Sequence, residues 1–327
     1  MEDIAIELVK QHAENLDNVA IWGRVPYTED DYLIGKLGFV ICLYVENPHE
    51  QERRERLMQA AELYRQACGD KAPPLYAWED RPTRGVPSKG IDYERGLSRL
   101  RGQGFSFLLT HKDHHTAEHH NLAILAPADR GPDIPELGYF YATLPTGWGV
   151  NAHPYQFVPL MLKLCEIIQP VHGTIGMGLI PPPWQERAYD CAEQLYPLLH
   201  QHIGLDAYVP STSNLLGGMS SVNWLNAIDN QLLEKLGGMA ALRASLPETE
   251  YPVYNFGSGV LIQAGSAPAL GDREVGDLLP QYRAVAKFLK PIRVPFRPAS
   301  LYVPPGAINN DASERQAAIE YLQRFDD

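Results

Sequence analysis

The longest uninterrupted apolar run in the chain, Phe39–Val45, sets the first limit on what it can fold into. The stretch Leu37–Val45 is rich in β-branched and aromatic residues, which favours a strand buried on both faces. A membrane-spanning helix needs about 18 or more apolar residues, far more than this run offers. The sequence therefore predicts a buried sheet and no membrane partner.

Strand patterns and helix patterns are interspersed along the rest of the chain. Further strands are expected at residues 75–78, 105–109, 121–126, 138–144 and 171–180, with a hairpin over 253–263. Helices are expected at residues 50–68, 155–168, 188–202, 222–236, 239–246 and 280–290. Residues 80–104, rich in Gly, Pro, Arg and Ser, are expected to form the longest loop.

The order of these elements lacks a strict βαβ rhythm, which favours the α+β class. We expect antiparallel or mixed sheets covered by helices, and an αβ part joined to an α/β/α sandwich is one arrangement that fits. Both halves carry a similar order of strands and helices. This predicts an N-terminal α+β domain over residues 1–150 and a C-terminal α/β sandwich domain over residues 151–327.

The chain is acidic, since 40 Asp and Glu residues against 28 Lys and Arg residues give a net charge of −12. Such a surface repels phosphate backbones and attracts a basic protein, although solubility alone also explains it. We therefore expect no direct binding of nucleic acid. The acidic start MEDIAIELVK lacks the basic residues of a signal peptide, and the four cysteines form no CxxC pair. Both features predict a cytoplasmic protein with reduced thiols.

One segment carries a metal-site pattern: residues 111–120, with five histidines in ten positions. Within it, His115, Glu118 and His119 match the H-x-x-E-H pattern of inverted zinc proteases, which requires both histidines on one helical face. The segment lies between two predicted strands, so a turn is expected, and no third ligand can be identified. We therefore expect no catalytic residue, metal or cofactor, while a zinc hydrolase using these three residues remains an alternative.

The second half carries an ordered series of short motifs, mostly glycine-rich. They are His172-Gly173, Gly176–Ile180, Gly204–Asp206, Asn223–Ile228, Leu236–Gly238, Gly257–Gly265, Pro268–Asp272 and Arg324-Phe325. Together they resemble the TsiV-like family of type VI secretion immunity proteins, strongly over residues 155–325 and weakly before. The resemblance implies a bacterial antitoxin that binds a cognate effector, with a restriction-endonuclease-fold nuclease as its target and no catalytic residues of its own.

The acidic loops are the candidate contacts for such a partner. Glu29, Asp30 and Asp31 form one loop, and Asp133 and Glu136 form another; ordinary solvated turns are the alternative. The sequence thus predicts an immunity protein that blocks a basic, cytoplasm-acting nuclease by occluding its DNA-binding cleft or preventing its assembly. A chaperone that holds the effector for loading is a further alternative, and the oligomeric state is not predicted.

Overall fold

A computed structural model describes residues 4–24, 31–79, 81–100, 103–112, 116–131, 136–148, 154–183, 189, 191–207, 210–211, 215, 218–297, 301–308 and 310–326. The strands are β1 (Ala20–Arg24), β2 (Asp31–Val45), β3 (Leu75–Trp78), β4 (Arg84–Gly85), β5 (Phe105–Thr110), β6 (Leu122–Ala126), β7 (Gly138–Leu144), β8 (His172–Ile180), β9 (Leu225–Asp229), β10 (Val253–Asn255) and β11 (Gly259–Gln263). The α-helices are α1 (Ile4–Gln11), α2 (Gln51–Cys68), α3 (Tyr93–Ser98), α4 (Pro154–Ile168), α6 (Ala192–Gln201), α7 (Asn230–Lys235), α8 (Gly238–Ser245), α9 (Pro280–Leu289) and α10 (Asp311–Leu322).

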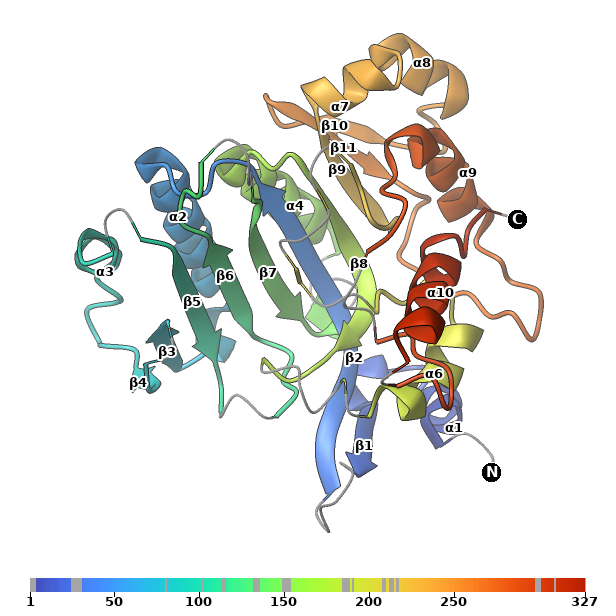
Figure 1. The fold of residues 1–327 in the computed structure, drawn as a ribbon, viewed down its shortest axis with the longest axis horizontal. Coiled ribbons are helices and arrows are strands. Elements are labelled where there is room, and N and C mark those ends of the chain that lie inside the picture. The colour runs from blue at the N-terminus through green and yellow to red at the C-terminus, as the bar shows by residue number, and fades with distance from the viewer. Residues whose placement is uncertain are drawn as a thin grey trace.

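The strands form one sheet in the order β10-β11-β9-β8-β2-β7-β6-β5-β3-β4, with β1 also paired to β2 (Figure 1). Every pairing between these strands is antiparallel. The predicted α+β class, an antiparallel sheet covered by helices, is confirmed. The sheet continues across residue 150 because β8 pairs with β2, and the division into two domains at that point stays a prediction.

The longest strand, β2, organises the sheet. Its residue Lys36 pairs with Ala20 of β1 and with Ile180 of β8, so β1 and β8 lie on opposite edges of β2. Beyond the end of β1, residues 39–45 of the same edge pair with β7. The predicted strand Leu37–Val45 is fully buried, as expected, and the strand begins earlier, at Asp31.

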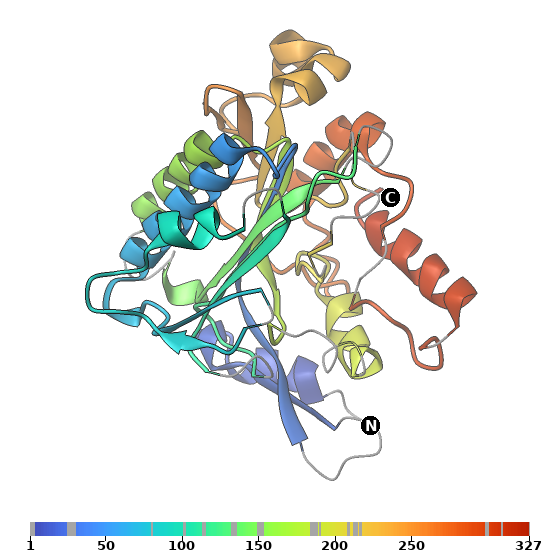
Figure 2. The same ribbon diagram turned by 60° about the vertical axis from the view of Figure 1, so that its left-hand side comes forward.

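Helices cover the sheet on both faces. Figures 1 and 2 show α2 and α4 side by side on one face, and α6, α9 and α10 on the other face beside the C-terminal strands. Phe39 of β2 packs against Phe157 of α4, with ring centroids 4.4 Å apart. All four cysteines are buried thiols, and none of the described helices is both long and apolar enough to span a bilayer.

One predicted helix is wrong in its first half. Residues 225–229 form strand β9, and the helix α7 begins only at Asn230. β9 lies between β8 and β11, and its residues Leu225–Ile228 are all buried. A short segment that is buried on both faces need not alternate between apolar and polar residues, so periodicity alone cannot distinguish it from a buried helix.

Candidate partner-binding surfaces

The predicted acidic contacts are described in part. Glu29, Asp30 and Asp133 lie outside the described residues. Asp31 begins β2, and its Oδ1 lies 3.3 Å from Nε of Arg24 across the β1–β2 ladder; its side chain is 58% exposed. The Oε1 atom of Glu136 lies 3.1 Å from Nη1 of Arg130, and its side chain is 23% exposed.

These two acidic positions lie near opposite ends of the long strand β2. Asp31 is the first residue of β2, whereas Gly138, two residues after Glu136, pairs with Val45 at the other end of that strand. The fourteen residue steps between Asp31 and Val45 span about 45 Å at about 3.3 Å per residue. One side of a standard interface covers about 800 Å², a patch roughly 30 Å across. The two loops are therefore two separate surfaces.

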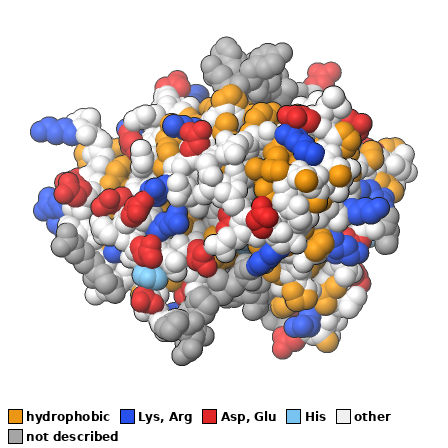
Figure 3. All heavy atoms as spheres, turned by 90° about the horizontal axis from the view of Figure 1, so that it is seen from above, with side chains coloured by type: hydrophobic (Ala, Val, Ile, Leu, Met, Phe, Trp, Pro, Cys, Tyr) orange, Lys and Arg blue, Asp and Glu red, His pale blue; other side chains and the backbone are white. Residues whose placement is uncertain are grey.

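On the face shown in Figure 3, the acidic side chains are not gathered in a single patch. Viewed from above in Figure 3, Asp and Glu side chains alternate with Lys, Arg and hydrophobic groups. The net charge of −12 is therefore a property of the whole molecule more than of one patch on this face.

The described part of the histidine-rich segment contacts β2 through Glu118 and His119. Glu118 accepts hydrogen bonds from Lys36 at 2.9 Å and lies 3.0 Å from Nζ of Lys112. Burial opposes ionisation of Glu118, yet the bonds from the two lysines outweigh it and lower its pKa. Nε2 of His119 lies 2.9 Å from the carbonyl oxygen of Leu37, and burial lowers the pKa of this ring.

The zinc-site pattern therefore lacks its expected geometry. Residues 116–120 are not helical, and His115 lies outside the described residues. Glu118 pairs with Lys36 and His119 contacts the carbonyl of Leu37, and these two contacts fix the segment to β2. The second partner of Glu118, Lys112, lies within the segment itself. Nowhere in the described ranges do three or more His, Cys, Asp or Glu side chains converge as metal ligands.

The motifs that carried the family resemblance act in the scaffold. Asn223 donates from Nδ2 to the carbonyl of Met177 at 2.9 Å and accepts from the backbone N–H of Trp224 at 2.8 Å. A Cβ at Gly176 would overlap the side chain of Asn223, which is why β8 carries glycine there. Arg324 is buried and donates to the carbonyl of Ile203 at 2.8 Å, which ties the C-terminus to the core.

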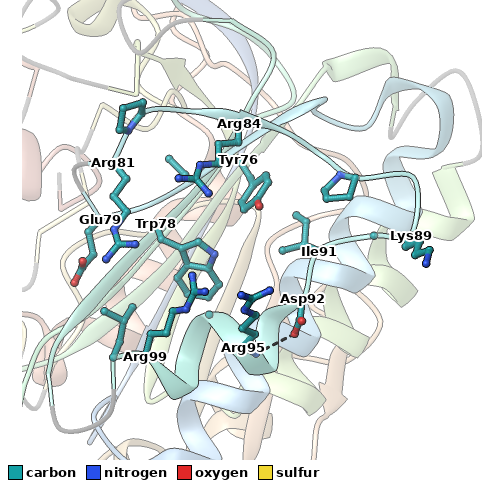
Figure 4. Close-up of a pocket in the computed structure, with 16 residues that line it drawn as sticks. Tyr76, Trp78, Glu79, Arg81, Arg84, Lys89, Ile91, Asp92, Arg95 and Arg99 are labelled. Carbon is teal, nitrogen blue, oxygen red and sulfur yellow. Dashed lines mark hydrogen bonds between the residues drawn. The ribbon is translucent and has the colours of Figure 1, made fainter.

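A cavity of about 600 Å³, which was not predicted from the sequence, lies at the β4 edge of the sheet (Figure 4). It lies between β3, the connection to β4 and α3. Five cationic side chains line it: Arg81, Arg84, Lys89, Arg95 and Arg99. Figure 4 shows the guanidinium groups of Arg81 and Arg84 on one side of Trp78 and those of Arg95 and Arg99 on the side of α3. We call this cavity the cationic cleft.

Two features of the sequence shape the cationic cleft. The indole of Trp78 packs against Phe107, with ring centroids 4.8 Å apart, and α3 lies so close that a Cβ at Gly96 would overlap that indole. The segment after α3 is held by buried Arg54 of α2, which donates to the carbonyls of Leu100 at 2.8 Å and of Gln103 at 2.9 Å.

The charges of the cationic cleft are unbalanced. Its lining holds five cations and two carboxylates, Glu79 and Asp92, a local charge of 5 − 2 = +3. Asp92 is engaged in capping α3, since its Oδ1 accepts from the backbone N–H of Arg95 at 2.9 Å. Within the described ranges, no ion pair involves any of the five cations. Residues 80–104 were predicted to be a loop, and the five basic residues within 81–99 were the signal that could have indicated this cleft.

Comparison with known proteins identifies the family. A solved structure, Pseudomonas aeruginosa T6SS protein PA0821, aligns with a TM-score of 0.79 over 98% of this chain and 91% of that chain at 20% identity, a likeness that shows a shared fold. No curated protein matches the chain. The TsiV family model, described as type VI immunity for VRR-NUC, matches residues 56–325. The chain therefore belongs to the TsiV family of type VI immunity proteins.

Proposed function

We propose that this protein neutralises a type VI effector of the VRR-NUC nuclease class by binding it in the cytoplasm, where the nuclease reaches DNA. The observation that carries the proposal is the match of the TsiV family model over residues 56–325. The charge of the chain agrees with it. A nuclease needs a basic surface to hold phosphates, and a protein of net charge −12 attracts such a surface.

The proposed mode of action is occlusion of the DNA-binding cleft of the effector, or prevention of its assembly, without catalysis. Asp31 and Glu136 supply candidate contacts, together with Glu29, Asp30 and Asp133. Because Asp31 and Glu136 lie near opposite ends of β2, a strand of up to about 45 Å when extended, we expect a standard interface to include one acidic loop and not both. The contribution of each loop is therefore separable by mutation.

The test is protection of cells and capture of the effector. Bacteria that produce a candidate VRR-NUC effector from the same genome should survive when they also produce the wild-type chain, and the two proteins should be captured together. Reversal of Glu29, Asp30 and Asp31 to Lys tests one loop, and reversal of Asp133 and Glu136 to Lys tests the other. Loss of capture by one set alone would locate the interface. Capture of the effector by both variants at the wild-type level would remove the acidic loops from the proposal. Failure of the wild type to protect the cells would refute the function.

The same cells distinguish inhibition from a chaperone role. A loading chaperone acts with the secretion machine, whereas an inhibitor protects cells that lack it. We expect full protection in cells without the secretion machine, and protection that requires the machine would favour loading.

Metal analysis addresses the zinc hydrolase. We expect purified, untagged protein to carry no stoichiometric zinc, because Glu118 and His119 already hold other partners. Zinc at one equivalent that is lost in His119→Ala would favour the hydrolase instead.

A further inference from the structure

The cationic cleft is an exception on an acidic protein. Five of its 28 Lys and Arg residues line one cavity, and all five side chains are exposed. Like charges placed together repel one another unless a counter-charge is supplied. Among the described residues no carboxylate forms an ion pair with them, and the two carboxylates of the lining leave a local charge of +3. The arrangement therefore favours the approach of an anionic group.

We infer that the cationic cleft receives an acidic segment of the nuclease effector, which presents two or more carboxylates to the guanidinium groups. This inference rests on the proposed function and adds to it a second, oppositely charged contact. Arg81 and Arg84 form one wall of the cleft and Arg95 and Arg99 form the other (Figure 4). Each guanidinium is planar and offers paired donors that match the two oxygens of a carboxylate.

The surroundings of the cleft suit a protein ligand. Tyr76, Trp78 and Ile91 line it beside the cations, so a bound segment finds apolar and aromatic surface as well as charge. A second groove shares Glu79 and Arg81 with the cleft and continues along the end of the sheet to Glu136. A chain seated in the cleft can therefore extend over neighbouring surface, as a partner larger than a single ion requires.

Nucleic acid fits the cleft less well than a protein segment. Its binding depends on neutralising several phosphates at once against the field of the whole protein. That field is set here by a net charge of −12, and the cleft offers five cations against it. A short acidic segment of an otherwise basic protein is favoured by both charges. The basic surface of that protein is attracted by the net negative charge of this chain, and the carboxylates of the segment pair with the cations of the cleft.

Charge reversal in the cleft tests the inference. The variant Arg95→Glu/Arg99→Glu reverses one wall, and Arg81→Glu/Arg84→Glu reverses the other, so the test survives misfolding of either. The matched control is Lys235→Glu/Lys287→Glu, which makes the same change in net charge at exposed lysines of α7 and α9. Thermal unfolding followed by circular dichroism confirms that each variant folds.

The readout is titration calorimetry against a catalytically inactive form of the VRR-NUC effector that the wild-type chain captures in the protection test. We expect each cleft variant to bind at least about tenfold more weakly than the wild type, and the control to stay within about threefold. The loss should shrink as salt is raised from about 50 to about 200 mM, because exposed charges are screened. Cleft variants that bind within about threefold of the control would overturn the inference.

Two further probes separate the sources of the anion. Wild type and variants are titrated with a single-stranded oligonucleotide and with inorganic pyrophosphate. If the cleft variants lose either of these ligands and keep the effector, the cleft is a phosphate site and the inference is wrong. A wild-type protein that fails to bind the effector would refute the proposed function as well, whereas retained binding by the cleft variants refutes this inference alone.

Discussion

Arg54 offers the sharpest test of how the scaffold builds the cationic cleft. This arginine of α2 is 2% exposed and donates to the carbonyls of Leu100 and Gln103, the residues that follow α3. Its guanidinium also stacks over Phe105, 5.0 Å from the ring centroid. Replacement by methionine, Arg54→Met, keeps the apolar stem of the side chain and removes all of its donors.

The magnitude follows from these contacts. Each hydrogen bond from a charged donor contributes about 1.5–3 kcal/mol, and its loss leaves a carbonyl of Leu100 or Gln103 without that donor. Relief of the buried charge offsets part of this, because Nε of Arg54 has no hydrogen-bond partner in the described residues and burial lowers the pKa of the group. We expect Arg54→Met to lower the free energy of unfolding by about 3 kcal/mol.

Urea unfolding followed by tryptophan fluorescence measures this change, with Arg53→Met as the control. Arg53 is the neighbouring residue on the same helix, and its Nη1 makes one long contact, 3.4 Å to Oε1 of Gln169, so its replacement should cost about 0.5 kcal/mol. Hydrogen exchange should also accelerate in residues 93–104 of Arg54→Met. A loss below about 1 kcal/mol, or unchanged exchange there, would refute the assigned role of Arg54.

Two further predictions concern the scaffold. Arg293 donates hydrogen bonds to Asp326 at 2.6 and 2.5 Å, and these bonds outweigh burial and lower the pKa of Asp326. Their stabilisation of the folded state is therefore present above the unfolded pKa of about 3.9 and is lost as pH falls through the folded pKa. Asp326→Asn should therefore cost about 1 kcal/mol at pH 7 by urea unfolding, and the difference from wild type should vanish in acid; a difference independent of pH would contradict this. Gly176→Ala should cost about 3 kcal/mol or more because its Cβ would overlap Asn223, and near-wild-type thermal stability would show that β8 can yield there.

Patterns that depend on neighbours in sequence predicted the fold well. The helix over residues 50–68 is α2, with Leu57, Ala60 and Tyr64 buried as their spacing requires, and the hairpin around Gly257 is β10 and β11. The failure at residues 225–229 has a physical cause. β9 is covered on both faces and both edges, so its residues lost the alternation that identifies a strand.

The candidate surfaces were harder to predict because they depend on contacts distant in sequence. Asp31 and Glu136 gave the same signal, an acidic loop, and only the antiparallel register of β2 and β7 shows that they lie far apart. The cationic cleft forms because β4 and α3 fold back over Trp78, a packing that needs Gly96 and the anchor at Arg54. Composition marked residues 80–104 as a loop, and it carries no information about which side such a loop faces.

The net negative charge of the chain and the cationic cleft have distinct consequences for recognition of the effector. Before contact, an approaching partner responds mainly to the net charge of −12, which attracts a basic nuclease with a strength that falls as salt shortens the Debye length of about 8 Å. Every nuclease carries a basic surface for its substrate, so that attraction cannot by itself distinguish the cognate effector from another. The cleft, with its local charge of +3, would repel the basic surface and pair with carboxylates instead. An effector that lacks an acidic segment at the matching position would then meet unpaired arginines, and the contact would disfavour it. Specificity is thus expected to reside in the cleft more than in the acidic loops, and the cleft variants should lose discrimination between effectors as well as affinity.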